Sequence, residues 1–145
     1  MLLTGTHPRT LDDKKRLALP KRVRDQLGDP LDTLYVTPGP DQCLWLFTRA
    51  DLERLAEKLD QAPAADAEAR VFRRLYFAQT EAVDVDRSGR ILLPERLVQF
   101  ANLRHDVVLL GVRDHLELWD QERWQNYLTQ HAPQFDAVAE SAFRK

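Results

Sequence analysis

Polar and apolar positions alternate in short runs along this chain. In the segment RLALP at 16–20, two leucines are separated by one small residue and preceded by an arginine, which is the two-residue period of a strand with one buried face. The segments TLYV at 33–36 and CLWLF at 43–47 are rich in β-forming residues, and TPGPDQ between them is a turn signal. The pattern predicts short strands joined by tight turns.

Helical spacing follows these strands. Val23 and Leu27 lie four residues apart and Gly28 comes next, which predicts a short helix that ends at the glycine. Thr48 and Asp120 are residue types that cap helix N-termini, and each precedes apolar residues at helical spacing. The apolar positions of these two longer helices are Leu52, Leu55, Leu59, Trp124 and Leu128.

The chain contains an internal repeat. LDDKKRLALPKRV at 11–23 aligns without a gap with VDRSGRILLPERL at 85–97, and five of the thirteen positions are identical. The identities match Asp12 with Asp86, Arg16 with Arg90, Leu19 with Leu93, Pro20 with Pro94, and Arg22 with Arg96. The likeness continues downstream, so we predict that each half runs strand, turn, strand, short helix, strand, strand and longer helix.

We expect the two halves to form one domain of mainly β structure with helices, an α+β fold. A half with about four short strands buries too little apolar surface to be stable alone, so the copies would interlock about a pseudo-twofold axis. The expected segments are a first repeat at 5–50, a connecting helix region at 60–78, a second repeat at 80–123, and a C-terminal helix and tail at 124–145. Because an Ala-Pro pair opens the final APQFDAVAESAFRK, we expect a loosely attached tail there.

Charge is concentrated in one part of the chain. The formal net charge is −2, yet residues 9–24 hold seven basic side chains against two carboxylates, which leaves the rest at −7. A local basic patch in a protein of pI near 6.1 favours selective contact with nucleic acid over general polyanion binding. The candidate DNA-binding residues are Arg9, Lys14, Lys15, Arg16, Lys21, Arg22 and Arg24.

These candidates differ in what they can recognise. Lysine is a flexible point charge suited to phosphates, whereas the planar fork of arginine can bond to guanine O6 and N7 together, so Arg16 is the favoured base reader. A structural alternative stays open, in which Arg16 and Arg90 pair with Asp12 and Asp86 across their own turns. The first copy carries more positive charge than the second and is therefore the expected DNA face.

The residues GTHPRTLDDKKRLALPKRVRDQL, the second Asp-x-x-x-Arg copy at 86–90 and the LELWDQERW ending resemble the MraZ family of bacterial transcriptional regulators. The resemblance implies a pair of AbrB-like swapped-hairpin β-barrel units in one chain and assembly into ring-shaped homo-oligomers. It also implies repression of the division and cell wall gene cluster through short direct repeats of double-stranded DNA upstream of its first gene, association with the nucleoid, and a DNA contact at Arg16. The family's first motif usually has glycine where this chain has Lys15.

Other functional classes have less support in the sequence. Cys43 is the only cysteine and sits in an apolar stretch, which predicts a buried, unreactive thiol. We expect a cytoplasmic protein without a membrane span, cofactor or metal, and not an enzyme, because no motif organises its histidines and carboxylates. The alternative function is an antitoxin-like module that binds DNA and a toxin partner, although such chains usually carry one motif copy and a longer extension.

Overall fold

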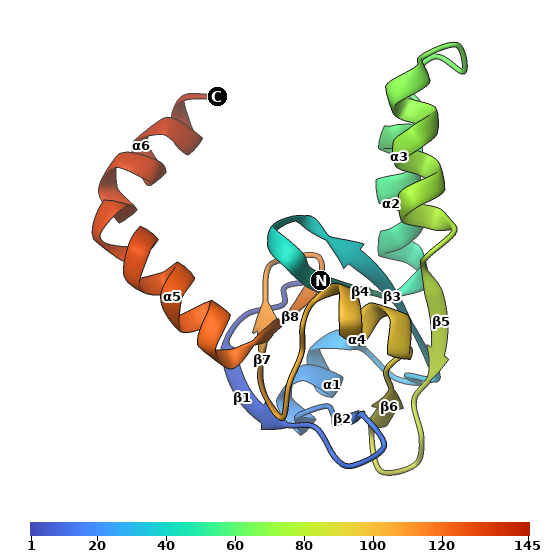
Figure 1. The fold of residues 1–145 in the computed structure, drawn as a ribbon, viewed down its shortest axis with the longest axis vertical. Helices are drawn as coiled ribbons and strands as arrows, with labels where there is room; N and C mark the ends of the chain where they lie inside the picture. The colour runs from blue at the N-terminus through green and yellow to red at the C-terminus, as the bar shows by residue number, and fades with distance from the viewer.

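The two halves of the chain fold into the same succession of elements in a computed structural model that describes residues 1–145 (Figure 1). The first half contains β1 (Thr6–Thr10), β2 (Arg16–Ala18), α1 (Lys21–Leu27), β3 (Thr33–Gly39), β4 (Cys43–Phe47) and α2 (Arg49–Leu59). The second contains β5 (Glu81–Asp84), β6 (Arg90–Leu92), α4 (Glu95–Phe100), β7 (Asp106–Gly111), β8 (Leu116–Asp120) and α5 (Gln121–His131). This order confirms the predicted repeat.

The strands exchange partners between the halves. A six-stranded antiparallel sheet has the order β1-β7-β8-β4-β3-β5, and β2 and β6 form a separate two-stranded ribbon. Each half places its first strand beside the other half's third strand, β1 on β7 and β5 on β3. The halves are therefore interlocked, which is the swapped-hairpin arrangement expected from the resemblance.

A pseudo-twofold axis relates the halves. In the β2–β6 ribbon, Leu17 pairs with Ile91, which is its own counterpart in the sequence repeat. In the sheet, Trp45 of β4 pairs with Glu117 of β8, and these two residues are also aligned in the repeat. Two self-equivalent pairs define the axis and confirm one fused pseudo-twofold α+β domain.

Both halves supply one continuous core. A cluster of 21 buried residues includes Leu17 and Val23 from the first repeat and Ile91 and Leu97 from the second. A smaller cluster includes Cys43, whose thiol is free and buried. Burial, and then the negative charge of Glu117, raise the pKa of this thiol to about 12. The prediction of a buried cysteine is therefore confirmed, and the raised pKa keeps the thiol protonated near neutral pH.

The ends of the helices α1, α2 and α5 follow the predictions in part. Gly28 ends α1 with a φ of 101°, and the Thr48 hydroxyl accepts a hydrogen bond from the N–H of Asp51 at the start of α2. Asp120 precedes α5, but its side chain makes no capping bond. The carboxylate of Asp120 instead accepts from Arg104, at 2.8 Å from Nη2, so Asp120 has the predicted N-cap position but not a capping hydrogen bond.

Helical segments lie outside the β structure on both sides. The connecting helix α3 (Ala67–Phe77) lies beside α2, as Figure 1 shows, and confirms the predicted helix between the repeats. After α5 comes a short 3-10 turn, η2 (Ala132–Gln134), and then α6 (Phe135–Arg144). The C-terminal segment expected as a tail is thus helical, and it is exposed along nearly its whole length. Pro133 does not prevent this, because it occupies a first-turn position where its missing N–H is not needed. None of the helices combines the length and the hydrophobicity that a membrane-spanning helix requires.

Candidate nucleic-acid interface

The first Asp-x-x-x-Arg motif closes the turn that leads into β2. Asp12 Oδ1 accepts hydrogen bonds from the N–H groups of Lys14 and Arg16, both at 2.9 Å. The N–H of Lys15 donates to the Asp12 carbonyl at 2.9 Å. The bond from the Arg16 N–H is the main cause of the lowered pKa of Asp12, and partial burial opposes it. Asp12 therefore remains a charged acceptor that shapes the turn.

The second motif repeats this geometry in the turn that leads into β6. Asp86 Oδ1 accepts from the N–H groups of Ser88 and Arg90, both at 2.9 Å, and the N–H of Gly89 donates to the Asp86 carbonyl at 2.9 Å. The Arg90 N–H is likewise the main cause of a lowered pKa at Asp86. The motif aspartates thus have the same structural role in both copies.

The motif arginines also bond to these aspartates. Arg16 Nε lies 2.6 Å from Asp12 Oδ2, and Arg90 Nε lies 3.0 Å from Asp86 Oδ2. The pairing that the structural alternative assumes is therefore present in both turns. Only the Nε edge is engaged, however, because the Nη groups of both arginines have no protein partner and reach solvent. Each guanidinium is held in a fixed orientation and keeps two donor groups for a ligand.

The outer face of the β2–β6 ribbon combines charged and apolar side chains. Leu17 and Ile91 are buried and point into the core. The alternate positions face outward, as two cross-strand pairs, Arg16 with Leu92 and Ala18 with Arg90. Leu92 is 57% exposed, although it is a large apolar residue. This face therefore offers two oriented arginines and two apolar side chains to a partner.

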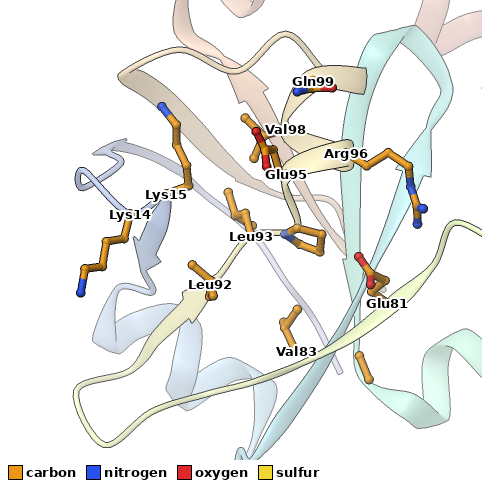
Figure 2. A pocket seen from close by; sticks show the side chains of 12 residues that line it. Lys14, Lys15, Glu81, Val83, Leu92, Leu93, Glu95, Arg96, Val98 and Gln99 are labelled. Carbon is orange, nitrogen blue, oxygen red and sulfur yellow. The ribbon is translucent and has the colours of Figure 1, made fainter.

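The exchange of strands places each motif turn beside the short helix of the other repeat. At one end of the ribbon, the N–H of Leu93 donates to the Lys15 carbonyl, and the first turn borders the start of α4. Figure 2 shows Lys14 and Lys15 on one side of this cleft, Arg96 on the other, and Leu93 between them. The first turn therefore shares its cleft with residues of the second repeat.

At the other end, the second turn borders α1 of the first repeat. The N–H of Leu19 donates to the Gly89 carbonyl at 2.9 Å. The side chain of Arg24 lies so close to Gly89 that a Cβ there would be 2.7 Å from Arg24 Nε. Lys21 and Arg22 of the same helix are exposed, and Lys21 pairs with Asp25 at 3.1 Å.

The predicted site residues therefore divide into two groups. The two turns are four strand residues apart along the ribbon, roughly 13 Å. Lys14 and Lys15 lie at one end, whereas the residues of α1, Lys21, Arg22 and Arg24, lie at the other. The swapped pairing places the first copy's helix beside the second turn, so the basic residues of the first copy lie at both ends of the ribbon. Arg9 lies on the edge strand β1, half-buried, with its Nε buried and unpaired.

Sequence reasoning missed two basic residues at these ends. Arg87 lies in the second turn and is exposed, and Arg96 lies at the start of α4 and is also exposed. The signal was present in the alignment of the repeats, where Arg96 matches Arg22. A count of charge along the chain does not reveal these two residues, because each end of the ribbon combines a turn of one repeat with a helix of the other.

The structure explains why one turn has lysine and the other glycine. Lys15 adopts a φ of 64° and Gly89 a φ of 78°, so both turns need the left-handed region. A side chain at Gly89 would have to displace the Arg24 side chain that lies against it. Its counterpart in the repeat alignment is the shorter Val98, which borders the same cleft as Lys15. Lysine is therefore sterically accommodated at position 15, at the cost of backbone strain.

Lys15→Gly is expected to raise the free energy of unfolding by about 1 kcal/mol, because glycine adopts this φ without strain. The same change removes a positive charge, so DNA binding should weaken and the salt dependence of the affinity should fall by about one unit. Thermal denaturation and titrations at several salt concentrations measure the two effects. Lys14→Ala is the control, since it removes a charge without relieving strain. Tighter DNA binding after Lys15→Gly would contradict a phosphate contact at Lys15.

One cluster of titratable groups is found away from the ribbon. His115 is buried between Asp114 and Glu117, with Nδ1 2.9 Å from Asp114 Oδ1 and Nε2 3.0 Å from Glu117 Oε2. Its ring stacks on Trp45 at a centroid distance of 4.0 Å and lies against Phe47. The contacts occupy both ring nitrogens and cover the ring, which is the setting of a structural histidine. No group of histidine, cysteine and acidic residues is arranged to hold a metal ion.

Comparison with known proteins agrees with the duplicated fold. The model of a family described as "MraZ protein, putative antitoxin-like" matches this chain twice, at residues 2–75 and 76–145. The chain belongs to the MraZ family. A transcriptional regulator MraZ of Kineococcus radiotolerans is 39% identical over 134 residues, 92% of each chain. Those of Heliobacterium modesticaldum and Saccharopolyspora erythraea are 37% and 38% identical over 139 residues, 96% of this chain and 95% of theirs.

Membership of the MraZ family agrees with the site described above. The matched relatives are named as transcriptional regulators and not as enzymes. The family match divides the chain between residues 75 and 76, so each copy includes the helices that follow its strands. Both Asp-x-x-x-Arg turns and both strands of the ribbon lie within the matched segments.

Proposed function

We propose that this MraZ family member is a DNA-binding transcriptional regulator that inserts the outer face of its β2–β6 ribbon into the major groove. As a ring-shaped homo-oligomer in the cytoplasm, associated with the nucleoid, it represses the division and cell wall cluster from short direct repeats upstream. The observation that carries the proposal is the outer face itself, which presents Arg16, Ala18, Arg90 and Leu92 together.

The dimensions of the ribbon suit the major groove. That groove is about 12 Å wide and admits a two-stranded β-ribbon. With the ribbon lying in it, the turns at its two ends, roughly 13 Å apart, reach toward opposite walls of the groove. Lys14 and Lys15 at one end, and Arg87 and Arg22 at the other, are exposed and suited to contact phosphates.

The outward side chains have the chemistry for reading base edges. The Nη groups of Arg16 and Arg90 are free to donate to guanine O6 and N7, and the Nε bond to the motif aspartate holds each guanidinium in place. Ala18 and Leu92 are suited to apolar contact with the methyl group of thymine. The aspartates act as positioning residues, since they touch the arginines and not the DNA.

Oligomerisation supplies the affinity that one small basic face lacks. A few phosphate contacts give weak binding that falls steeply with salt. Once one subunit of a ring is bound, its neighbour meets the adjacent repeat at a high effective concentration. Direct repeats match the successive subunits of a ring, as palindromes match an isologous dimer.

A titration with the DNA upstream of the protein's own gene tests the proposal. Fluorescence anisotropy at several salt concentrations should show tighter binding to this DNA than to a scrambled sequence of the same length and composition. The logarithm of the affinity should fall linearly with the logarithm of the salt concentration. Equal affinity for the two sequences at every salt concentration would contradict sequence-specific regulation.

The antitoxin-like alternative is supported by the description of the family and by the exposed C-terminal helix. A stable complex with a small toxin protein, purified together with the chain and released on truncation of α6, would favour that function. The two motif copies favour the regulator.

A further inference from the structure

The C-terminal helix α6 carries an apolar stripe that contacts none of the large clusters of the fold. The stripe consists of Phe135, of Val138 and Phe143, which follow it by three and eight residues, and of Ala139 and Ala142 between them. This spacing places them on one face of the helix. Phe135 is 72% exposed and Phe143 is 92% exposed. Such a stripe is the mark of a helix whose packing partner is another surface.

A second apolar surface of the molecule is a groove of about 470 Å³. It lies between the helices α2 and α3 and the turn that joins β3 to β4. The helix-borne apolar residues that line it are Leu55, Leu59, Phe72, Leu75, Tyr76 and Phe100. Leu75 is 58% exposed at its rim. The groove is therefore a second unpartnered apolar surface on the same chain.

The two surfaces lie apart within one chain. The helices α5 and α6 project from one side of the β body, and α2 and α3 project from the other (Figure 1). The 11-residue helix α5 leads the chain away from the groove, and Trp124 and Tyr127 on α5 pack against Trp119 of the body. The separation leaves both surfaces open to a second molecule.

The charges beside the two surfaces are complementary. The helix α3 carries three arginines against one glutamate, and Arg74 is exposed without an ion pair. The helix α6 carries two carboxylates against one arginine, and that arginine pairs with Glu140, which leaves Asp136 unpaired. The two helices are also of similar length, 10 and 11 residues. Charge and length therefore favour a second copy of this chain as the occupant of the groove.

We propose that α6 of one molecule docks into the groove between α2 and α3 of the next. The contact joins two different surfaces, so it is head-to-tail, and repetition of such a contact closes a ring when the rotation permits. The proposal rests on the ring assembly of the proposed function and names the surfaces that build it.

Two single substitutions test the contact in the full chain. Phe143→Glu places a charge on the α6 stripe, and Leu75→Glu places one at the rim of the groove. Each variant should have the mass of a single chain by light scattering or native mass spectrometry, where the wild type is an oligomer. Both positions are exposed, so the melting temperature of each variant should match that of the wild type. This match would show that the loss of mass is not caused by unfolding. Ser141→Glu and Glu57→Lys, on the polar faces of α6 and α2, are the matched controls and should keep the wild-type mass.

A mixture of the two variants gives the decisive result. The Leu75→Glu protein retains an intact α6, and the Phe143→Glu protein retains an intact groove, so an equimolar mixture should form a complex of two chains and no larger species. Oligomers of wild-type size in either variant, a monomeric wild type, or a mixture that stays monomeric would overturn the proposal. If α6 binds a toxin instead of the groove, Leu75→Glu should leave the mass of the purified chain unchanged. That result would also count against the proposal. These masses are measured without DNA, so failure of the contact is distinguishable from failure of DNA binding.

Discussion

Arg16→Ala is expected to lower the affinity for the upstream DNA about ten-fold to one-hundred-fold, which corresponds to the loss of one bidentate base contact. Discrimination against scrambled DNA should fall with it, because an arginine that reads a base contributes to specificity as well as to affinity. The effect should be measured by fluorescence anisotropy on both DNA sequences at one salt concentration. A variant that retains wild-type affinity and discrimination would show that Arg16 has only a structural role.

The pairing with Asp12 calls for controls on the turn. Arg16→Lys keeps the charge and loses the fork, so it should recover part of the affinity and little of the discrimination. Arg22→Ala removes an exposed charge from α1 and should weaken binding to both sequences nearly equally. If thermal denaturation shows that Arg16→Ala unfolds more readily than Arg16→Lys, the comparison between Arg16→Lys and the wild type carries the test.

Leu17→Ala is expected to lower the free energy of unfolding by about 2–5 kcal/mol, the usual cost of a cavity at a fully buried leucine. Leu17 is completely buried where the two repeats cross, opposite Ile91 on the pseudo-twofold axis. Because both halves share one core, unfolding should remain a single transition by circular dichroism and by tryptophan fluorescence. Urea denaturation measures the change.

Ile91→Ala on the other side of the axis completes a double-mutant cycle. Since the two side chains share one site, their combined loss should differ from the sum of the single losses. Two separate unfolding transitions, with only one of them shifted by Leu17→Ala, would show that the repeats are independent domains.

The local pattern of the chain predicted most of the fold. The alternation around Leu17 and Leu19 predicted the strand β2, and Gly28 predicted the end of α1. The alignment of the repeats predicted the pseudo-twofold axis. The small size of each half predicted that the halves interlock, but the pairing of hairpins between them was expected only through the resemblance to MraZ. A strand shows by its own sequence that one face is buried, but not which strand lies beside it. For this reason the position of Arg24 over Gly89 was not predicted.

The candidate site was predicted in composition but not in arrangement. Spacing alone could not decide whether Arg16 pairs with Asp12 or faces a ligand, and the structure shows that Nε does the first while the Nη groups remain free for the second. Asp120 was assigned a capping role from its position, but Arg104, which is distant in sequence, binds its carboxylate. Both outcomes depend on tertiary contacts that no local pattern contains.

Protection of guanine N7 from dimethyl sulfate is the most direct test of the central claim, because this atom lies in the major groove. With wild-type protein, guanines within the upstream repeats should be protected. Arg16→Ala and Arg90→Ala should each restore the reactivity of different guanines, since the two arginines lie at different points along the ribbon. Guanines that stay fully reactive under saturating, sequence-specific binding would contradict insertion of the β2–β6 ribbon into the major groove.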